Sequence, residues 1–138
     1  MPRKDIYHDT VKNALIKDGW IITHDPLTLS FGGRDTYVDL GAERLIGFTK
    51  EEEKIAVEVK SFIGVSIIDD LEKAIGQYIL YQKILSRIEP ERVLYIAVSQ
   101  ATFTGIFSEP LGNLFLLDKD IKLIVFDREA EVILRWIR

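Results

Sequence analysis

The first third of the chain alternates between apolar and polar positions in a way that predicts one helix followed by short strands. Between Lys4 and Lys17 the apolar residues recur at helical spacing, namely Tyr7, Val11, Ala14 and Leu15. Gly19 follows, where a glycine commonly closes a helix. The β-branched and aromatic run Trp20–Thr23 and the alternating run Leu27–Phe31 then predict two strands.

Two further helical stretches follow later in the chain. A hydroxyl at Ser66, with acidic residues directly after it at Asp69 and Asp70, is typical of a helix start, and helical spacing continues to about Ser86. The stretch from Ala101 to Leu117 also favours a helix, but it contains Pro110 and Gly112. We therefore expect a kink there, or two short helices.

The remaining apolar runs predict the body of a sheet. Residues Thr36–Phe48 and Lys54–Phe62 are extended segments, which we expect to pair as an antiparallel hairpin with its turn near Glu51. The almost continuous apolar run Val93–Val98 is typical of a central strand covered on both faces. Two last strands, Ile121–Phe126 and Glu131–Ile137, are separated by a tight turn.

This order of elements predicts the α/β class, with a mixed sheet flanked by helices in three α/β/α layers. The length of 138 residues and 47% hydrophobic content predict one domain over residues 1–138.

The absence of cysteine excludes disulfides and thiol chemistry, and two histidines alone disfavour a zinc site. No apolar stretch resembles a signal peptide or a membrane span, so we expect a cytoplasmic protein with no membrane association.

Charge narrows the classes of function. The net charge is −4, and basic and acidic residues are spread evenly along the chain. Phosphate contacts supply most non-specific affinity for nucleic acids, so generic coating of DNA is disfavoured unless a local groove concentrates lysines.

Three charged residues occupy strands that are otherwise apolar. Asp39 lies in the segment Tyr37–Gly41, while Glu58 and Lys60 share one face of the next strand because side chains alternate with period two. Unpaired charges are costly to bury, so such residues pair, bind metal or line a cleft. Two carboxylates are suitable oxygen ligands for Mg²⁺ or Mn²⁺. An adjacent lysine can orient or deprotonate a water molecule that attacks a phosphodiester.

A structural ion pair is the competing interpretation of the same residues. Glu58 and Lys60 could pair on a solvated strand face while Asp39 accepts backbone hydrogen bonds in a turn. The following helix, however, carries Gln77 and Tyr81 at i, i+4 on one face, which extends the pattern to four parts.

Asp39 with Glu58-Val59-Lys60 resembles the core of the PD-(D/E)XK nucleases, and Gln77–Tyr81 resembles the Q-x-x-x-Y element of their RecB-like branch. Val38 stands where the superfamily pattern has proline. Nearly the whole chain resembles the XisH family, the fdxN element excision controlling factors of cyanobacteria. The segments that carry this resemblance are Asp39–Glu43, Lys54–Phe62, Gly76–Tyr78, Phe107–Pro110 and Lys122–Asp127.

The resemblance implies a restriction-endonuclease-like fold and a role in controlling DNA-element excision, alongside an XisI-like companion protein and a site-specific recombinase. It also implies that Asp39, Glu58 and the Val59 carbonyl hold Mg²⁺ or Mn²⁺. Lys60 would position the attacking water, and Gln77 would brace the lysine or a phosphate oxygen. Tyr81 would orient the same network or contact the nucleic-acid backbone. A homodimer would be needed for cutting both strands of DNA.

The function itself stays open between two classes. One is a metal-dependent endonuclease acting on DNA; the other is a non-catalytic regulatory module of the same fold that binds a protein partner and guides a recombinase. The acidic charge favours the second, and the intact Asp39, Glu58 and Lys60 set favours the first.

A few other residues have weaker assignments. Glu43 is either a further metal ligand or an acid that faces water, and we expect His8 to be a hydrogen-bonded packing residue. Arg34, Arg44 and Ser61 flank the expected cleft, where they either contact phosphate or are solvated. Trp20 and Trp136 are expected in the core or an interface, not as base-stacking platforms.

Overall fold

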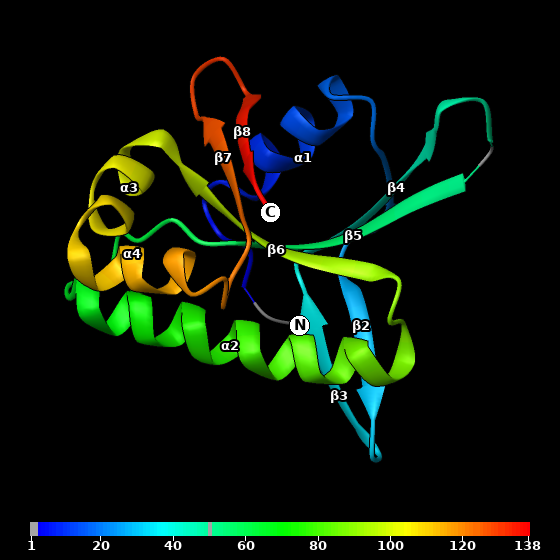
Figure 1. The fold of residues 1–138 in the computed structure, drawn as a ribbon, viewed down its shortest axis with the longest axis horizontal. Helices are drawn as coiled ribbons and strands as arrows, with labels where there is room; N and C mark the ends of the chain where they lie inside the picture. Colours follow the sequence, from blue (N-terminus) through cyan, green and yellow to red (C-terminus); the bar gives the residue numbers. More distant parts are fainter. Residues whose placement is uncertain (1–2, 50) are drawn as a thin grey trace.

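A six-stranded mixed sheet forms the centre of the molecule in the computed structural model, which describes residues 3–49 and 51–138 (Figure 1). Its strands lie in the order β1-β4-β5-β6-β7-β8. The three central strands are parallel to one another, and the outer pairings are antiparallel. The bounds are β1 (Ile21–His24), β4 (Leu40–Ile46), β5 (Glu51–Val59), β6 (Arg92–Ser99), β7 (Leu123–Asp127) and β8 (Val132–Ile137).

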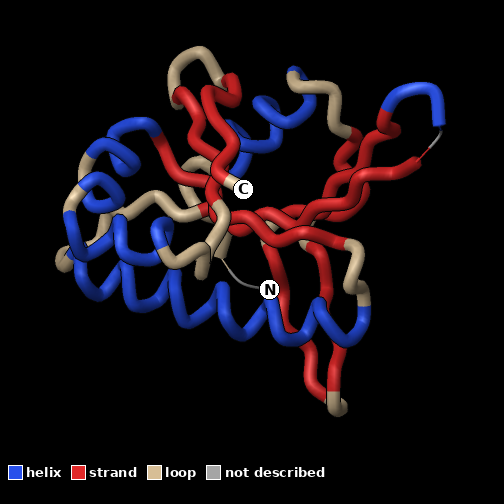
Figure 2. Tube along the Cα trace, viewed as in Figure 1, coloured by secondary structure: helices blue, strands red, loops and turns tan. Residues whose placement is uncertain are grey.

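Helices cover both faces of this sheet (Figure 2). On one face the buried side chains of β5, β6 and β7 pack against α2 (Ile67–Ile88), α3 (Gln100–Thr104) and α4 (Pro110–Leu117). On the other face the alternate side chains of the same strands pack against α1 (His8–Lys17). The prediction of a mixed α/β fold with flanking helices is therefore confirmed.

Several element predictions are also confirmed. The apolar run of residues 93–98 lies within β6, which has a parallel neighbour on each side. This agrees with the prediction of a central strand covered on both faces. The interrupted stretch before residue 117 forms α3, a 3-10 turn (Ile106–Ser108) and α4, whose first residue is Pro110. The side-chain hydroxyl of Ser66 accepts from the Asp69 amide at the start of α2. The first helix is shorter than predicted, because it begins at His8.

One strand prediction is wrong. The segment Thr36–Phe48 is not a single strand: β3 (Arg34–Val38) pairs with β2 (Leu27–Phe31) in a separate two-stranded sheet, and the chain enters the main sheet only at Leu40. Gly32 and Gly33, with φ of +60° and +78°, form the tight turn of this hairpin. Asp39 lies at the junction between β3 and β4, where the chain passes from one sheet to the other.

The hairpin between β4 and β5 also differs in detail from the prediction. A short 3-10 turn (Gly47–Thr49) lies at its tip, just before the position near Glu51 where the turn was predicted, and β5 already begins at Glu51. Acidic residues of this stretch pair across the strands with β4, which keeps them extended; Lys50 lies outside the described residues. Strand β5 ends at Val59 instead of Phe62.

Within the described residues, no helix combines the length and apolar character needed to cross a bilayer.

Candidate active site

A pocket of about 190 Å³ lies at the carboxyl end of β5, where the strand meets the β3–β4 junction and helix α2. The structure brings into it every side chain that the sequence singled out for catalysis, together with the Val59 backbone. Its lining residues are Arg3, Asp5, Tyr37, Asp39, Glu58, Val59, Lys60, Gln77 and Tyr81.

The alternation of β5 explains this convergence. Ala56 points to the face that α2 covers, while Val57 and Val59 point to the opposite face. Glu58 and Lys60 therefore share the α2 face with Ala56, since side chains two apart lie on the same side of a strand. Gln77 and Tyr81 are one helical turn apart and line the same pocket from α2.

Two hydrogen bonds between side chain and backbone tie Asp39 to the end of β5. The Asp39 Oδ2 accepts from the Val59 amide at 2.7 Å, and the Glu58 Oε1 accepts from the Asp39 amide at 3.1 Å. The Lys60 Nζ lies 3.6 Å from the other Glu58 oxygen, Oε2. The two carboxylates and the ammonium group thus lie in one connected cluster instead of on opposite sides of the sheet.

The cluster has an unusual protonation balance. Burial, followed by the charge of Asp39, raises the pKa of Glu58 to about 8, although Lys60 opposes this shift. Glu58 is only 8% exposed. Burial and the Glu58 charge also raise the pKa of Tyr81, so its phenol keeps its proton near neutral pH and can act as a hydrogen-bond donor.

One polar atom on the wall of the pocket lacks a partner. The Gln77 Oε1 is buried and accepts no hydrogen bond from any described residue. A buried oxygen without a donor costs free energy, so its position favours an additional polar group in the pocket. Among the described residues, no group of three or more His, Cys, Asp or Glu side chains is arranged to hold a metal ion.

Sequence reasoning missed the contribution of the N-terminal segment. Arg3 and Asp5 line the pocket although they precede the first helix. The Asp5 Oδ1 accepts from the Tyr7 amide at 2.9 Å, and Oδ2 accepts from the Ser61 amide at 3.1 Å. An aspartate three residues before a helix is a local capping signal, but nothing in the sequence indicates its contact with a residue 56 positions away.

The other singled-out acid and histidine lie outside the pocket. Glu43 is on β4 opposite Lys54 of β5, and its Oε1 lies 3.6 Å from the Lys54 Nζ. His8 is 3% exposed, and its Nε2 lies 2.6 Å from the Asp25 Oδ1. His8 is thus a hydrogen-bonded packing residue, as expected, while Glu43 belongs to an ion pair away from Asp39 and Glu58.

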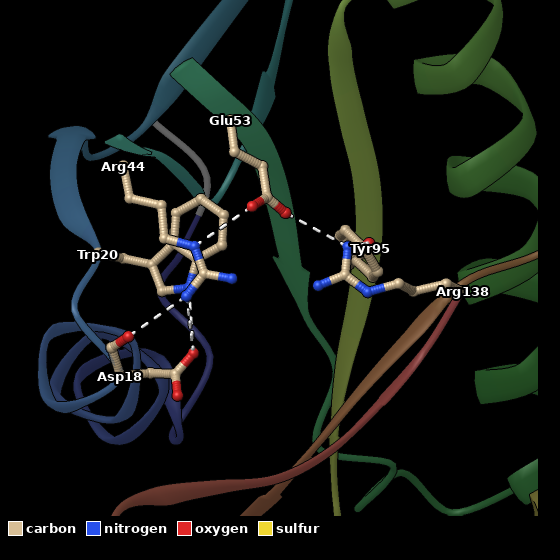
Figure 3. Close-up of polar contacts among 6 residues, drawn as sticks. All are labelled: Asp18, Trp20, Arg44, Glu53, Tyr95 and Arg138. Atoms are coloured by element: carbon tan, nitrogen blue, oxygen red, sulfur yellow. Dashed lines mark hydrogen bonds and ion pairs between the residues drawn. The ribbon is translucent and has the colours of Figure 1, made fainter. Parts of the chain in front are cut away.

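The expected position of two arginines beside the cleft is wrong. Arg34 lies exposed at the tip of the β2–β3 hairpin, because its strand leaves the main sheet. Arg44 stacks over the Trp20 ring at 4.2 Å and pairs with Asp18 and Glu53 at the opposite end of β5 (Figure 3). Ser61, by contrast, directly follows the pocket residue Lys60.

Trp20 belongs to the core and the partly buried Trp136 packs against it, in agreement with the expectation for both. Trp20 is 2% exposed, and its ring lies 5.7 Å from that of Trp136, which in turn contacts Tyr95 edge to face at 5.1 Å. Arg138 lies over the Trp136 ring. It also shares the Glu53 carboxylate with Arg44 (Figure 3). This aromatic and arginine network stabilises the end of the sheet away from the pocket.

Comparison with known proteins gives one consistent family. The family model described as XisH protein matches residues 1–134. An XisH family protein from Nostoc punctiforme is 44% identical, with a TM-score of 0.87, and the match covers 97% of this chain and 100% of that one. An fdxN element excision controlling factor protein from Anabaena variabilis is 43% identical, with a TM-score of 0.87 and coverage of 98% and 100%. No match was found among functionally curated proteins.

Proposed function

The chain belongs to the XisH family, and we propose that it controls excision of a DNA element through a metal-dependent phosphodiesterase site formed by Asp39, Glu58 and Lys60. The observation that carries this proposal is the convergence of these three side chains in one pocket, with Gln77 and Tyr81 beside them. The name of the Anabaena relative supports the role in excision. We include the restriction-endonuclease-like class and the PD-(D/E)XK assignment in this proposal.

The donor set suits a hard divalent cation. Mg²⁺ keeps several water ligands and is commonly held by one or two carboxylates, so two carboxylates satisfy it without a larger acidic cluster. Asp39, Glu58 and the Val59 carbonyl are the groups that would hold Mg²⁺ or Mn²⁺. When bound, the cation would supply Lewis-acid stabilisation of the negative charge that develops on the phosphate.

The protein's own residues would orient the other reactants. Lys60, whose ammonium faces the buried Glu58, orients the attacking water and offsets charge on the phosphate. The Gln77 Oε1, which has no donor in the structure, would accept a hydrogen bond from the Lys60 ammonium or from that water once substrate is bound, and the protonated Tyr81 phenol would donate to a phosphate oxygen. The water oxygen bonds to phosphorus, the P–O3′ bond breaks, and the 3′ oxygen leaves as a hydroxyl, so that the product carries a 5′-phosphate.

A non-catalytic regulatory module is the second candidate, and the net charge of −4 favours it. In that role the same fold would bind an XisI-like companion protein and guide a site-specific recombinase without cutting DNA. The two candidates differ in whether Lys60 and Asp39 are needed for any chemistry on DNA.

The test is incubation of the purified protein with supercoiled plasmid and Mg²⁺ or Mn²⁺. We expect the wild-type protein to nick the plasmid. Asp39→Ala and Lys60→Ala should each lower the rate of nicking at least about a hundredfold, because each removes a group that stabilises the transition state. Asp35→Ala, on the exposed part of β3, and Lys83→Ala, on the exposed face of α2, are matched controls that should nick normally. Nicking that survives both pocket substitutions would mark a contaminant and overturn the proposed activity, and absence of nicking would favour the regulatory module.

A further inference from the structure

A second pocket of about 230 Å³ directly adjoins the candidate active site. The two pockets share Asp5 and Lys60, so the Lys60 side chain separates them. The other lining residues come from the loop after β5 and the first turns of α2, namely Ser61, Phe62, Ile63, Gly64, Asp70 and Lys73.

The adjoining pocket is lined by two acids and two lysines, and the two acids differ from Lys73 in that both are held by hydrogen bonds. Both carboxylates accept hydrogen bonds from backbone N–H groups. Asp5 accepts from the Ser61 and Tyr7 amides, and the Asp70 Oδ2 accepts from the Gly64 amide at 2.9 Å. Lys73 makes no ion pair with any residue that the structure describes. Its ammonium group is therefore free to meet an anion from solution.

The loop that forms the wall is held in a specific conformation. Phe62 has φ of +54°, which an L-residue rarely adopts, and its ring packs edge to face on Phe107 at 5.6 Å. A Cβ atom at Gly64 would lie 2.5 Å from the Asp70 Oδ1, so any larger residue there would displace the carboxylate that holds the loop. With Asp5 bound to Ser61 as well, the loop is fixed at several points and the pocket is preformed.

Lys73 also continues the row of active-site residues on α2. Lys73, Gln77 and Tyr81 are spaced at i, i+4 and i+8, so they lie along one face of the helix. Four residues correspond to about 6 Å along a helix axis. This is the scale on which neighbouring phosphates follow one another along a nucleic-acid strand.

We propose that the adjoining pocket is a second phosphate subsite, in which Lys73 and the shared Lys60 bind the DNA phosphate next to the one that is cleaved. The inference rests on the proposed function, since it places the substrate backbone relative to that site. Local binding of this kind would let a protein with a net charge of −4 engage DNA without a general basic surface.

The test measures binding of a short fluorescein-labelled DNA duplex by fluorescence anisotropy, with Ca²⁺ present and over a range of salt concentrations. Lys73→Ala should weaken binding roughly threefold and Lys73→Glu roughly tenfold, and the slope of log affinity against log salt should fall by about one for Lys73→Ala. Lys83→Glu makes the same charge change two to three turns further along α2, on its exposed surface, and should change affinity by less than about twofold. Circular dichroism of each variant checks that it is folded.

The outcomes separate this inference from the proposed function. Equal affinity of Lys73→Glu and Lys83→Glu, with plasmid nicking that still depends on Lys60, would overturn the subsite alone. Absence of any Lys60-dependent nicking would overturn the proposed activity and the subsite with it. Weaker binding by Lys73→Glu than by Lys83→Glu, together with Lys60-dependent nicking, would support both.

Discussion

Asp39 performs two tasks at the scale of a single residue. Its carboxylate faces the pocket beside Glu58, and the same carboxylate accepts the Val59 amide at 2.7 Å. The backbone hydrogen bond that the structural interpretation expected is therefore present, and the same carboxylate lies where the proposed nuclease role requires it. Substitutions that separate charge from hydrogen bonding can measure each contribution.

Asp39→Asn should leave the free energy of unfolding unchanged or raise it at about pH 8, because the amide oxygen can still accept from Val59 while repulsion with Glu58 is removed. Asp39→Ala leaves the buried Val59 amide without an acceptor and should cost about 1–3 kcal/mol. Urea denaturation of both variants without divalent cations checks this. Equal destabilisation by both substitutions would contradict it.

Glu58 should make the stability of the metal-free protein depend on pH. Its pKa of about 8 in the folded state lies above its ordinary value of 4.5, so between these values the folded protein holds a proton that the unfolded chain has lost. The contribution of Glu58 to the free energy of unfolding is therefore fully present below about pH 4.5. It is lost as the pH rises toward about 8, by on the order of a few kcal/mol.

Urea denaturation at about pH 5 and about pH 9 measures this dependence, which Glu58→Gln should largely remove because glutamine cannot ionise. Glu72→Gln, on the exposed face of α2, is the matched control and should keep the wild-type profile. A Glu58→Gln profile as steep as that of the wild type would show that another group is responsible.

The sequence predicted that Glu58 and Lys60 lie together because both are local exceptions to a strong pattern. Glu58 and Lys60 interrupt an apolar strand, and their common face follows from period two alone. Arg3 and Asp5 could not be predicted in the same way, because an acid before a helix is ordinary and its bond to Ser61 joins distant parts of the chain. Arg44 was placed wrongly since the pattern does not indicate which end of the strand it occupies.

At the scale of elements, the junction between β3 and β4 positions Asp39. Val38 packs with the cluster under α2, whereas Leu40 packs with the cluster under α1. Residues two apart in one strand would lie on the same face, so the chain must rotate at Asp39. The alternation of apolar residues continues across the break, which is why the sequence favoured a single strand from Thr36 to Phe48.

Two helical glycines should respond in opposite directions to the same substitution. A Cβ atom at Gly112 of α4 would lie 2.1 Å from the Ile106 carbonyl oxygen, so Gly112→Ala forces the backbone apart and should cost about 2 kcal/mol or more. Gly76 of α2 has open space around its Cβ position, so Gly76→Ala should stabilise by about 0.5–1 kcal/mol. Thermal unfolding of the two variants checks the contrast, and a stabilising Gly112→Ala would contradict the close approach.

At the scale of the whole molecule, the fold separates stability from chemistry along β5. Its amino end carries Glu53, bound between Arg44 and Arg138 over the aromatic network (Figure 3). Its carboxyl end carries Glu58 and Lys60 in an open pocket. The strand therefore holds an acid paired with arginines at one end and, at the other, the buried Glu58 that we propose binds a cation.

This exchange links cation affinity, folding and pH. Near neutral pH most of the folded protein carries a proton on Glu58, which a cation bound to that carboxylate must displace. The affinity for Mn²⁺ should therefore rise with pH up to about 8 and level off above it. A cation that binds the folded state alone also raises stability, so the Mn²⁺-induced increase in Tm should be larger at about pH 8 than at about pH 6.

Titration calorimetry with Mn²⁺ in two buffers of different ionisation enthalpy measures the proton release directly. We expect the wild type and Glu72→Gln to release a proton near neutral pH, whereas Glu58→Gln should release none and bind more weakly. Asp39→Ala, which keeps Glu58 but removes the second carboxylate, should lower affinity as well. Mn²⁺ affinity that is independent of pH in the wild type would mean that Glu58 does not hold the cation, and binding untouched by either substitution would move the cation site away from this pocket.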